Sequence, residues 1–291
     1  MKKMKTPIIG VMFISAVLFL TAAASLVVTA QNSTADAYNL GDQEKLIIHS
    51  ITNSTYDPDN LAKAQELLEL QKAQNRKEIA ASVNASYNKL KASGELPIVT
   101  DHLDVSGSTV ATVEDSCLPL LADHHDEGRS VSGAMPYIID QAYVLNKNLI
   151  RNKVLVGPAG VGSAGAWGWV GYTFMYDGKP GPANVVMIGH IYGLTTALAG
   201  GASNSEIDLY VYDHTDVTEY STSIYHQGAG PAGWYEVNED FNKGVTVFLY
   251  PGHVYTMCLQ VDGSTSVYGA GEAGSNFFDG GAGARFTSLK F

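Results

Sequence analysis

The chain has 291 residues, of which 18 are lysine or arginine and 29 are aspartate or glutamate, so its formal net charge is −11. This acidic balance argues against nucleic acid and against an anionic membrane surface as partners, because both attract basic patches. Only 16% of the residues are charged, so the acidity by itself indicates solubility and identifies no cationic ligand.

Residues 1–30 have the order of a secretory export segment. Three lysines come first, residues 7–28 carry no charge, and the segment ends on small residues at Val28-Thr29-Ala30. The uncharged run is also as long as the ~20 residues of a membrane-spanning helix, so the segment is either a cleaved signal peptide or a retained anchor. In both cases we expect the rest of the chain to be extracellular or at the cell surface, since the positive charges precede the segment. Cleavage after Ala30 would leave 15 basic and 29 acidic residues, a formal charge of −14.

The start of this segment, Thr6-Pro7-Ile8-Ile9-Gly10-Val11-Met12, resembles the hydrophobic helix of archaeal type IV pilin-like proteins. Lys5 and Thr6 occupy the place of the small residue that usually precedes the cleavage point in that family. The resemblance implies a helix that is retained and packs into a filament core.

Residues 31–96 are predicted to form a polar segment followed by a helix. N-glycosylation sequons begin at Asn32, Asn53 and Asn84, and none follows residue 90, so glycosylation would coat this first part of the chain. Asp57-Pro58 supplies a helix start, and Gly94 supplies a helix stop.

The predicted helix over residues 59–93 is long, and its apolar stripe is imperfect. Gln71 and Asn75 interrupt the stripe near its centre, which argues against a regular coiled coil. The helix is therefore expected either to project as a stalk or to lie against the main domain.

Residues 97–291 change to a β-rich composition of glycine, tyrosine, valine, threonine and alanine. In residues 207–213 apolar and polar or tyrosine residues alternate, which is typical of a strand with one buried face. Turns are indicated at Asp177-Gly178, Pro251-Gly252 and Asp262-Gly263. The predicted strands are residues 137–145, 167–176, 184–192, 206–213, 218–225, 245–250, 254–261 and 284–291. So many strands without helices between them predict a mainly β fold, an antiparallel β-sandwich or jelly roll preceded by the long helix.

The last part of the chain resembles β-sandwich domains of secreted microbial surface proteins. A strand at residues 245–250, a Pro251-Gly252 turn, a strand opening on Val254-Tyr255, a glycine-rich run and a closing strand carry the resemblance. It implies a domain that binds or displays and seldom catalyses, and it assigns no site residues.

Two cysteines, Cys117 and Cys258, are the whole cysteine content of the chain. In an oxidising compartment two such residues tend to pair, so a disulfide between them is one expectation. The alternative is two buried thiols.

Two glycine-rich runs, at residues 160–165 and 269–274, match the spacing G-x-G-x-x-G. A dinucleotide site needs a helix directly after this loop, whereas the first run leads into strand-like sequence at residues 167–174. We therefore do not expect a nucleotide site. No nucleophile-elbow or H-E-x-x-H motif occurs, so the sequence gives no catalytic residues and favours a protein that is not an enzyme.

Two polar clusters contain candidate metal ligands. Asp213 and Asp216 lie at a predicted strand end, where two carboxylates three residues apart in a turn suit calcium, with an Asx-type turn as the alternative. His124 and Asp126 lie in the densest polar cluster, for which the alternative is a solvated loop.

Aromatic residues are frequent, with 16 tyrosines and three tryptophans. Trp167 and Trp169 are two residues apart and should share one face of a strand, which is more often a core face. Trp234 and Tyr235, flanked by glycine and proline, are the best local candidates for stacking on a sugar ring.

These observations favour a secreted or surface-tethered binding or adhesion protein whose partners are glycans or other cell-surface proteins. The membrane would be contacted only through residues 7–28. A structural subunit of a surface layer, sheath or pilus-like filament, which would form homo-oligomers, is the first alternative. An extracellular hydrolase is the second.

Overall fold

The computed structural model describes residues 57–106, 124–135, 137–145 and 148–291. The predicted export segment, the sequons at Asn32 and Asn53, and Cys117 lie outside these residues. In the part that is described, no helix combines the length and the apolar character needed to span a membrane.

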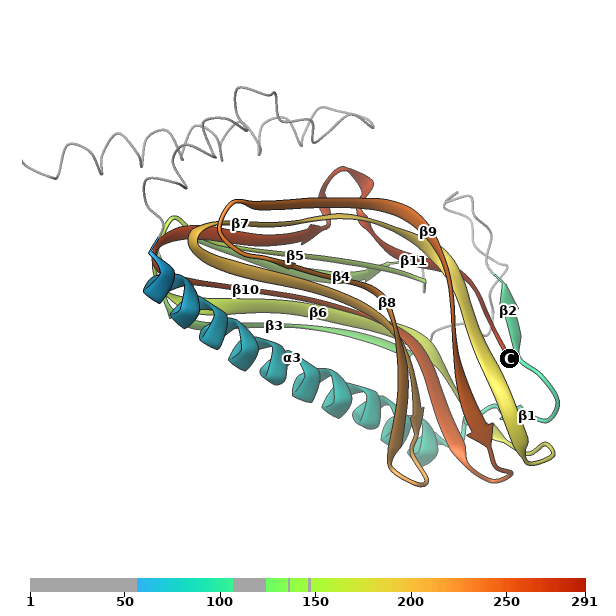
Figure 1. The fold of residues 1–291 in the computed structure, drawn as a ribbon. Helices are drawn as coiled ribbons and strands as arrows, with labels where there is room; N and C mark the ends of the chain where they lie inside the picture. Colours follow the sequence, from blue (N-terminus) through green and yellow to red (C-terminus); the bar gives the residue numbers. More distant parts are fainter. Residues whose placement is uncertain (1–56, 107–123, 136, 146–147) are drawn as a thin grey trace, which may run out of the picture.

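In the described residues the protein is mainly β, with the long helix α3 ahead of a mostly antiparallel sheet that folds into a sandwich (Figure 1). The fold class expected from the sequence is confirmed. The elements in chain order are α3 (Pro58–Ser93), β1 (Ile98–Val99), β2 (Asp104–Ser106), β3 (His124–Ala134), β4 (Tyr137–Leu145), β5 (Leu149–Gly157), β6 (Ala159–Tyr176), β7 (Gly181–Asp213), β8 (Thr218–Ala229), β9 (Gly233–Leu249), β10 (Val254–Phe277), the 3₁₀ turn η1 (Asp279–Gly281) and β11 (Gly283–Lys290).

Two long strands, β7 and β10, belong to both layers of the sandwich. Residues 203–213 of β7 pair with β8, and residues 201–213 pair with residues 255–267 of β10. These residues of β10 also pair with β6, and β6 pairs with β3. We call this set of strands the helix layer. The other half of β7 pairs with β9 and β11, and the end of β10 pairs with β5, which pairs with β4. We call this second set the far layer.

The main core lies between the two layers, because alternate residues of each strand point inward. The alternation predicted for residues 207–213 is present, with Ile207, Leu209 and Val211 fully buried. The core joins residues of the helix layer to residues of the far layer, including Val170, Phe174, Leu209, Leu259, Met187, Ile191, Phe241 and Phe286.

Helix α3 starts and ends where the sequence predicts. The Asp57 side chain accepts a hydrogen bond from the Asp59 backbone N–H at 3.0 Å, and Pro58 occupies the first turn, where its missing N–H costs nothing. Gly94 ends the helix with φ at 72°, a left-handed conformation that favours glycine.

The helix lies along the outer side of the helix layer, so the structure has the packed arrangement and not the stalk (Figure 1). Ile79 and Val83 pack against Trp167, Trp169 and Tyr212 of the sheet. The two tryptophans therefore share one buried face, as their spacing predicts.

Both glycine-rich runs lie within strands and not in loops that precede helices. Gly160 of β6 pairs directly with Gly269 of β10, so the two runs are neighbours in one sheet.

Cys258 is a free, fully buried thiol beneath α3, packed with the tryptophans of the helix layer. Burial raises the pKa of its thiol to about 12. The predicted partner, Cys117, lies outside the described residues, and the predicted disulfide finds no support in the structure.

Thiol counting in the wild-type protein and in a Cys117→Ser variant tests whether Cys258 is a thiol. Without reductant we expect two reacting thiols per chain in the denatured wild-type protein and one in the denatured variant, and no reaction of the native variant, because Cys258 is buried and protonated. A variant protein that loses its fold, while the wild-type protein shows no free thiol under denaturing conditions without reductant, would establish the disulfide instead.

A substitution at Gly165 tests the packing of α3 against the sheet. A Cβ at this position would overlap the side-chain amides of Asn75 and Gln71, whereas a Cβ at Gly181 would meet nothing within 4 Å. We expect Gly165→Ala to lower the free energy of unfolding in urea by about 1–3 kcal/mol and Gly181→Ala to leave it nearly unchanged. Equal effects of the two substitutions would contradict the close approach of α3 to β6.

Candidate functional site

The outer face of the far layer brings aromatic and polar side chains together from four strands. Leu194 of β7 lies directly opposite Glu236 of β9 on one side and Asn276 of β10 on the other. Asn276 in turn lies opposite Lys153 of β5. Residues directly opposite each other share a face of the sheet, so these four side chains form a row across it.

A hollow follows this row. Its lining includes Tyr192, Leu194, Glu236, Asn276 and Asp279, and it is shallow and partly open to solvent. The Lys153 ammonium pairs with the Asp279 carboxylate, and the Asn276 amide donates a hydrogen bond to the same carboxylate at 3.0 Å. The floor is therefore held in place by polar contacts, while Glu236 is exposed at the side.

Trp234 lies two residues before Glu236 on β9 and so shares the outer face. Its indole N–H donates to the Glu236 carboxylate at 3.3 Å, and the ring is half-buried. Tyr192 lies on the other side of Leu194 along β7. An aromatic ring therefore flanks the hollow along each of two strands.

Tyr235 projects to the opposite side of β9, because adjacent residues of a strand alternate in direction. Its side chain is 43% exposed. The sequence pairs Trp234 with Tyr235 as candidates, but the strand separates them, and only Trp234 belongs to the outer face.

Asp213 and Asp216 do come together at the turn between β7 and β8. The Asp213 Oδ1 accepts hydrogen bonds from the backbone N–H groups of Thr215 and Asp216, which makes the Asx-type turn that was the alternative to calcium. A third group, His253, joins them from the turn between β9 and β10.

Of the other predicted metal pair, His124 and Asp126, the structure describes the side chain of Asp126 only. Asp126 of β3 is exposed and accepts a hydrogen bond from the Ser82 hydroxyl of α3 at 2.6 Å. His124 begins the same strand. Among the described residues, the one group of three close metal-ligating side chains is Asp213, Asp216 and His253.

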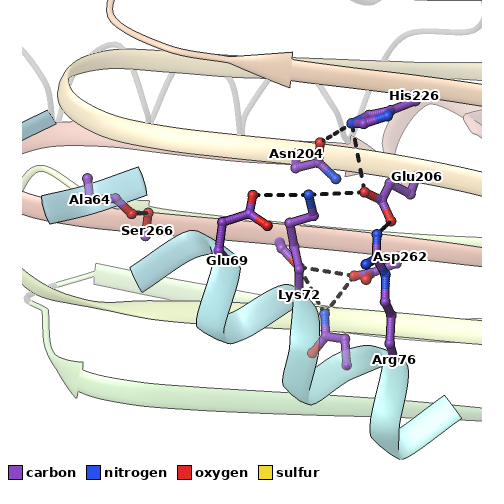
Figure 2. A network of polar contacts seen from close by, with 11 residues as sticks. Ala64, Glu69, Lys72, Arg76, Asn204, Glu206, His226, Asp262 and Ser266 are labelled. Carbon is purple, nitrogen blue, oxygen red and sulfur yellow. Dashed lines mark hydrogen bonds and ion pairs between the residues drawn. The ribbon is translucent and has the colours of Figure 1, made fainter. Parts of the chain in front are cut away.

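A buried polar seam joins α3 to the helix layer (Figure 2). We define the seam as Gln71, Lys72, Asn75 and Arg76 of the helix with Glu206 and Asp262 of the sheet. The Asn75 amide donates to Asp262 Oδ1 at 2.6 Å, and the Gln71 amide donates to Asn75 Oδ1 at 2.9 Å. The two residues that interrupt the apolar stripe are thus the ones that meet polar groups of the sheet.

The Glu206 carboxylate lies between two cations of the helix. Lys72 Nζ is 3.2 Å from one oxygen, and Arg76 Nη2 is 2.8 Å from the other. Burial disfavours the charged form, but the hydrogen bond of Arg76 and the charges of Lys72 and Arg76 outweigh it, so the pKa of Glu206 lies below its ordinary value.

Asp262 is buried in the same seam, but among the described residues it forms no ion pair with a lysine or arginine. Its Oδ1 accepts hydrogen bonds from Asn75 and Ser264, while its Oδ2 has no hydrogen-bond partner among the described residues. Burial raises the pKa of its carboxyl to about 7. Asp262 therefore carries a proton over most of the acidic range and becomes a buried anion above neutral pH.

Sequence reasoning missed Glu236, His253 and Asp262 as members of these clusters. The contacts that make them part of these clusters come from strands, turns or the helix distant in sequence: Leu194 for Glu236, Asp213 for His253 and Asn75 for Asp262. The interruptions at Gln71 and Asn75 were the available indication of the seam, because a polar residue on the buried side of a helix requires a polar partner.

The sequon at Asn84 lies on the exposed surface of α3, where the Asn84 side chain meets the imidazole of His214 at 3.0 Å. N-glycosylation modifies the amide nitrogen of asparagine, whereas the contact with His214 uses the Asn84 amide oxygen. A glycan on the nitrogen is therefore compatible with that contact.

Comparisons with known proteins give no family for this chain. No family model matches it, and no curated protein matches it. Among solved structures, the chain is similar to the enzymatically active domain of tailspike protein 4 of bacteriophage CBA120, at 13% identity and a TM-score of 0.22 over 56% of this chain and 19% of that one. This chain thus spans about a fifth of the tailspike domain.

Two further similar structures are carbohydrate-binding modules. One is TmCBM61 in complex with β-1,4-galactotriose, at 12% identity and a TM-score of 0.20 over 56% of this chain and 87% of the module. The other is the C-terminal family 22 module of Clostridium thermocellum Xyn10B, at 12% identity and a TM-score of 0.22 over 57% of this chain and 93% of the module. At TM-scores this low, the similarities support no conclusion about the present chain. Its fold and its site are derived from its own geometry.

The buried carboxyl of Asp262 predicts a pH effect on stability. The folded-state pKa of Asp262 lies above its ordinary value of 3.8, so the protonated carboxyl contributes its full stabilisation below pH 3.8. This stabilisation is lost as the pH rises through about 7. Asp262→Asn keeps the hydrogen-bond acceptor without the charge, so its free energy of unfolding, relative to that of the wild-type protein, should rise from about pH 4 to about pH 7 and level off between there and pH 8.5.

Urea unfolding of both proteins across this pH range measures the difference. Asp240→Asn is the matched control, because the Asp240 side chain is 91% exposed and should show no such trend. A constant difference between Asp262→Asn and the wild-type protein at all pH values would show that Asp262 does not change its protonation in this range.

Proposed function

We propose that this protein is a non-catalytic carbohydrate-binding protein of the cell surface or the extracellular space, and that the outer face of the far layer is its ligand surface. The observation that carries the proposal is the position of Trp234 beside the hollow between Glu236, Leu194 and Asn276. Strand pairing builds this arrangement from segments that are far apart in the sequence.

The chemistry of the outer face suits a sugar. An aromatic ring offers a flat apolar surface to the C–H groups of a pyranose, and Trp234 and Tyr192 present such rings on neighbouring strands. The exposed Glu236 carboxylate can accept hydrogen bonds from hydroxyls, while Asn276, Lys153 and Asp279, which contact one another, hold the floor beside it. A few placed polar groups in a mostly apolar hollow are typical of small-molecule sites.

The frame beneath the hollow is rigid enough to hold these groups in register. The strands that carry them are continuous with the core through Phe277, Val154 and Val237, which point inward from β10, β5 and β9. A site built on strands needs little ordering when a ligand binds, which limits the entropic cost of binding.

The location of the protein depends on residues 1–30, whose order supports export and whose length suits either a secreted or a tethered form. Binding of glycans on neighbouring cells or matrix by a tethered form would amount to adhesion.

The test of this proposal begins with a glycan array probed by the full-length protein, followed by calorimetric titration of the best ligand. Trp234→Ala should weaken binding by about tenfold or more, because an aromatic stacking contact contributes on the order of 1.4 kcal/mol. Tyr235→Ala is the matched control, since this neighbouring exposed tyrosine points to the other side of β9, and its removal should leave the affinity unchanged.

Failure of the wild-type protein to bind any sugar would reject the proposed ligand class. Equal losses in the two variants would place the ligand elsewhere than the outer face. Shortening of the oligosaccharide during the titration would favour the hydrolase hypothesis over simple binding.

A further inference from the structure

Two turns at one end of the sandwich bring three metal-ligating side chains together. Asp213 and Asp216 belong to the turn between β7 and β8, and His253 belongs to the turn between β9 and β10. The turns are held side by side by a hydrogen bond from the His214 N–H to the Val254 carbonyl at 2.9 Å. One ligand atom from each of the three side chains lies within 4.8 Å of the other two.

The distances among these atoms suit a shared ion. His253 Nδ1 is 2.9 Å from Asp213 Oδ2 and 4.0 Å from Asp216 Oδ2. The Asp213 side chain is only 4% exposed and that of His253 19%, whereas that of Asp216 is 57% exposed. The cluster is therefore buried on one side and open to solvent on the side of Asp216.

The carboxylate of Asp213 is oriented before any ion arrives. Its Oδ1 is occupied by the N–H groups of Thr215 and Asp216, at 2.9 and 3.2 Å, which directs Oδ2 toward His253. This leaves Oδ2 as the oxygen that a cation would meet.

The charge of the cluster is not balanced by basic side chains. Within the described residues, the ion-pair partner of both carboxylates is His253, and neither pairs with a lysine or arginine. Two carboxylates, one of them almost fully buried, form an unfavourable arrangement unless a positive charge accompanies them. A divalent cation would supply that charge.

We propose that Asp213, Asp216 and His253 bind a divalent transition-metal ion of the zinc class. The two aspartates alone suggest calcium, but calcium takes six to eight oxygen ligands, whereas this cluster offers an imidazole nitrogen and two carboxylate oxygens. Imidazole and carboxylate together suit zinc, for which three protein ligands leave one position for water. Zinc binds imidazole in its neutral form, so any proton on His253 Nδ1 would pass to solvent when the ion binds.

The bound ion would link two turns that are about 40 residues apart in the chain, and so would stabilise this end of the sandwich. This site does not depend on carbohydrate binding, because its ligands lie on turns and the hollow lies on the outer face of the far layer.

The experiment is a calorimetric titration of the chelator-treated, full-length protein with zinc chloride and, separately, with calcium chloride. We expect one zinc ion to bind per chain through this cluster, with calcium at least about tenfold weaker. Asp216→Asn should lower the zinc affinity by at least about tenfold, which is the low end of the cost of losing even an outer partner of a metal ligand. The exposed position of Asp216 makes this variant unlike a core substitution, and thermal unfolding without metal should match that of the wild-type protein.

Asp240→Asn is the matched control. Asp240 also pairs with a histidine, His190, at 2.8 Å, but no second carboxylate of the described residues completes a metal-ligating group with this pair. Removal of the Asp240 carboxylate should therefore leave zinc binding unchanged. The proposal is overturned by wild-type protein that binds no zinc, by calcium that binds more tightly than zinc, or by zinc affinity that is the same in Asp216→Asn as in the wild-type protein.

Discussion

Docking of α3 onto the outer side of the helix layer is the contact on which the rest of the structure depends. That side of the sheet carries Trp167, Trp169 and the thiol of Cys258, which would be exposed to water without the helix. It also carries Glu206 and Asp262, whose partners come from α3. The same contact therefore covers apolar surface and satisfies buried polar groups.

The two kinds of contact give the interface different properties. Apolar packing of Ile79 and Val83 against the tryptophans stabilises many similar registers of the helix, because burial of apolar area has little direction. The Asn75–Asp262 and Arg76–Glu206 contacts are directional, and a slip of the helix by one turn would leave both carboxylates buried without partners. The seam thus specifies where the helix lies.

The long strands β7 and β10 connect this interface to the two candidate sites. Their outer sides in the helix layer meet α3, while their other halves form the floor of the hollow on the far layer. The ends of the same strands lead into the turns that carry Asp213 and His253. One continuous framework thus holds a proposed ligand surface and a proposed metal site at separate places, so that each can be tested without disturbing the other.

The sequence by itself determined the local elements of this protein. The capping residues of α3, the alternation of residues 207–213 and the shared face of Trp167 and Trp169 depend on neighbours in the chain, and each was predicted with the correct type. Even so, the predicted strands at residues 184–192 and 206–213 are parts of one strand, because glycines and small polar residues between them pair with β10 where the strand passes between the layers.

Only the tertiary structure decided which side chains meet. It separated Trp234 from Tyr235, added His253 to Asp213 and Asp216, placed Glu236 and Asn276 on either side of Leu194, and set the helix against the sheet and not away from it. The physical reason is that strand pairing joins residues by register, and register follows from packing of the whole sheet and not from the residues nearest in sequence.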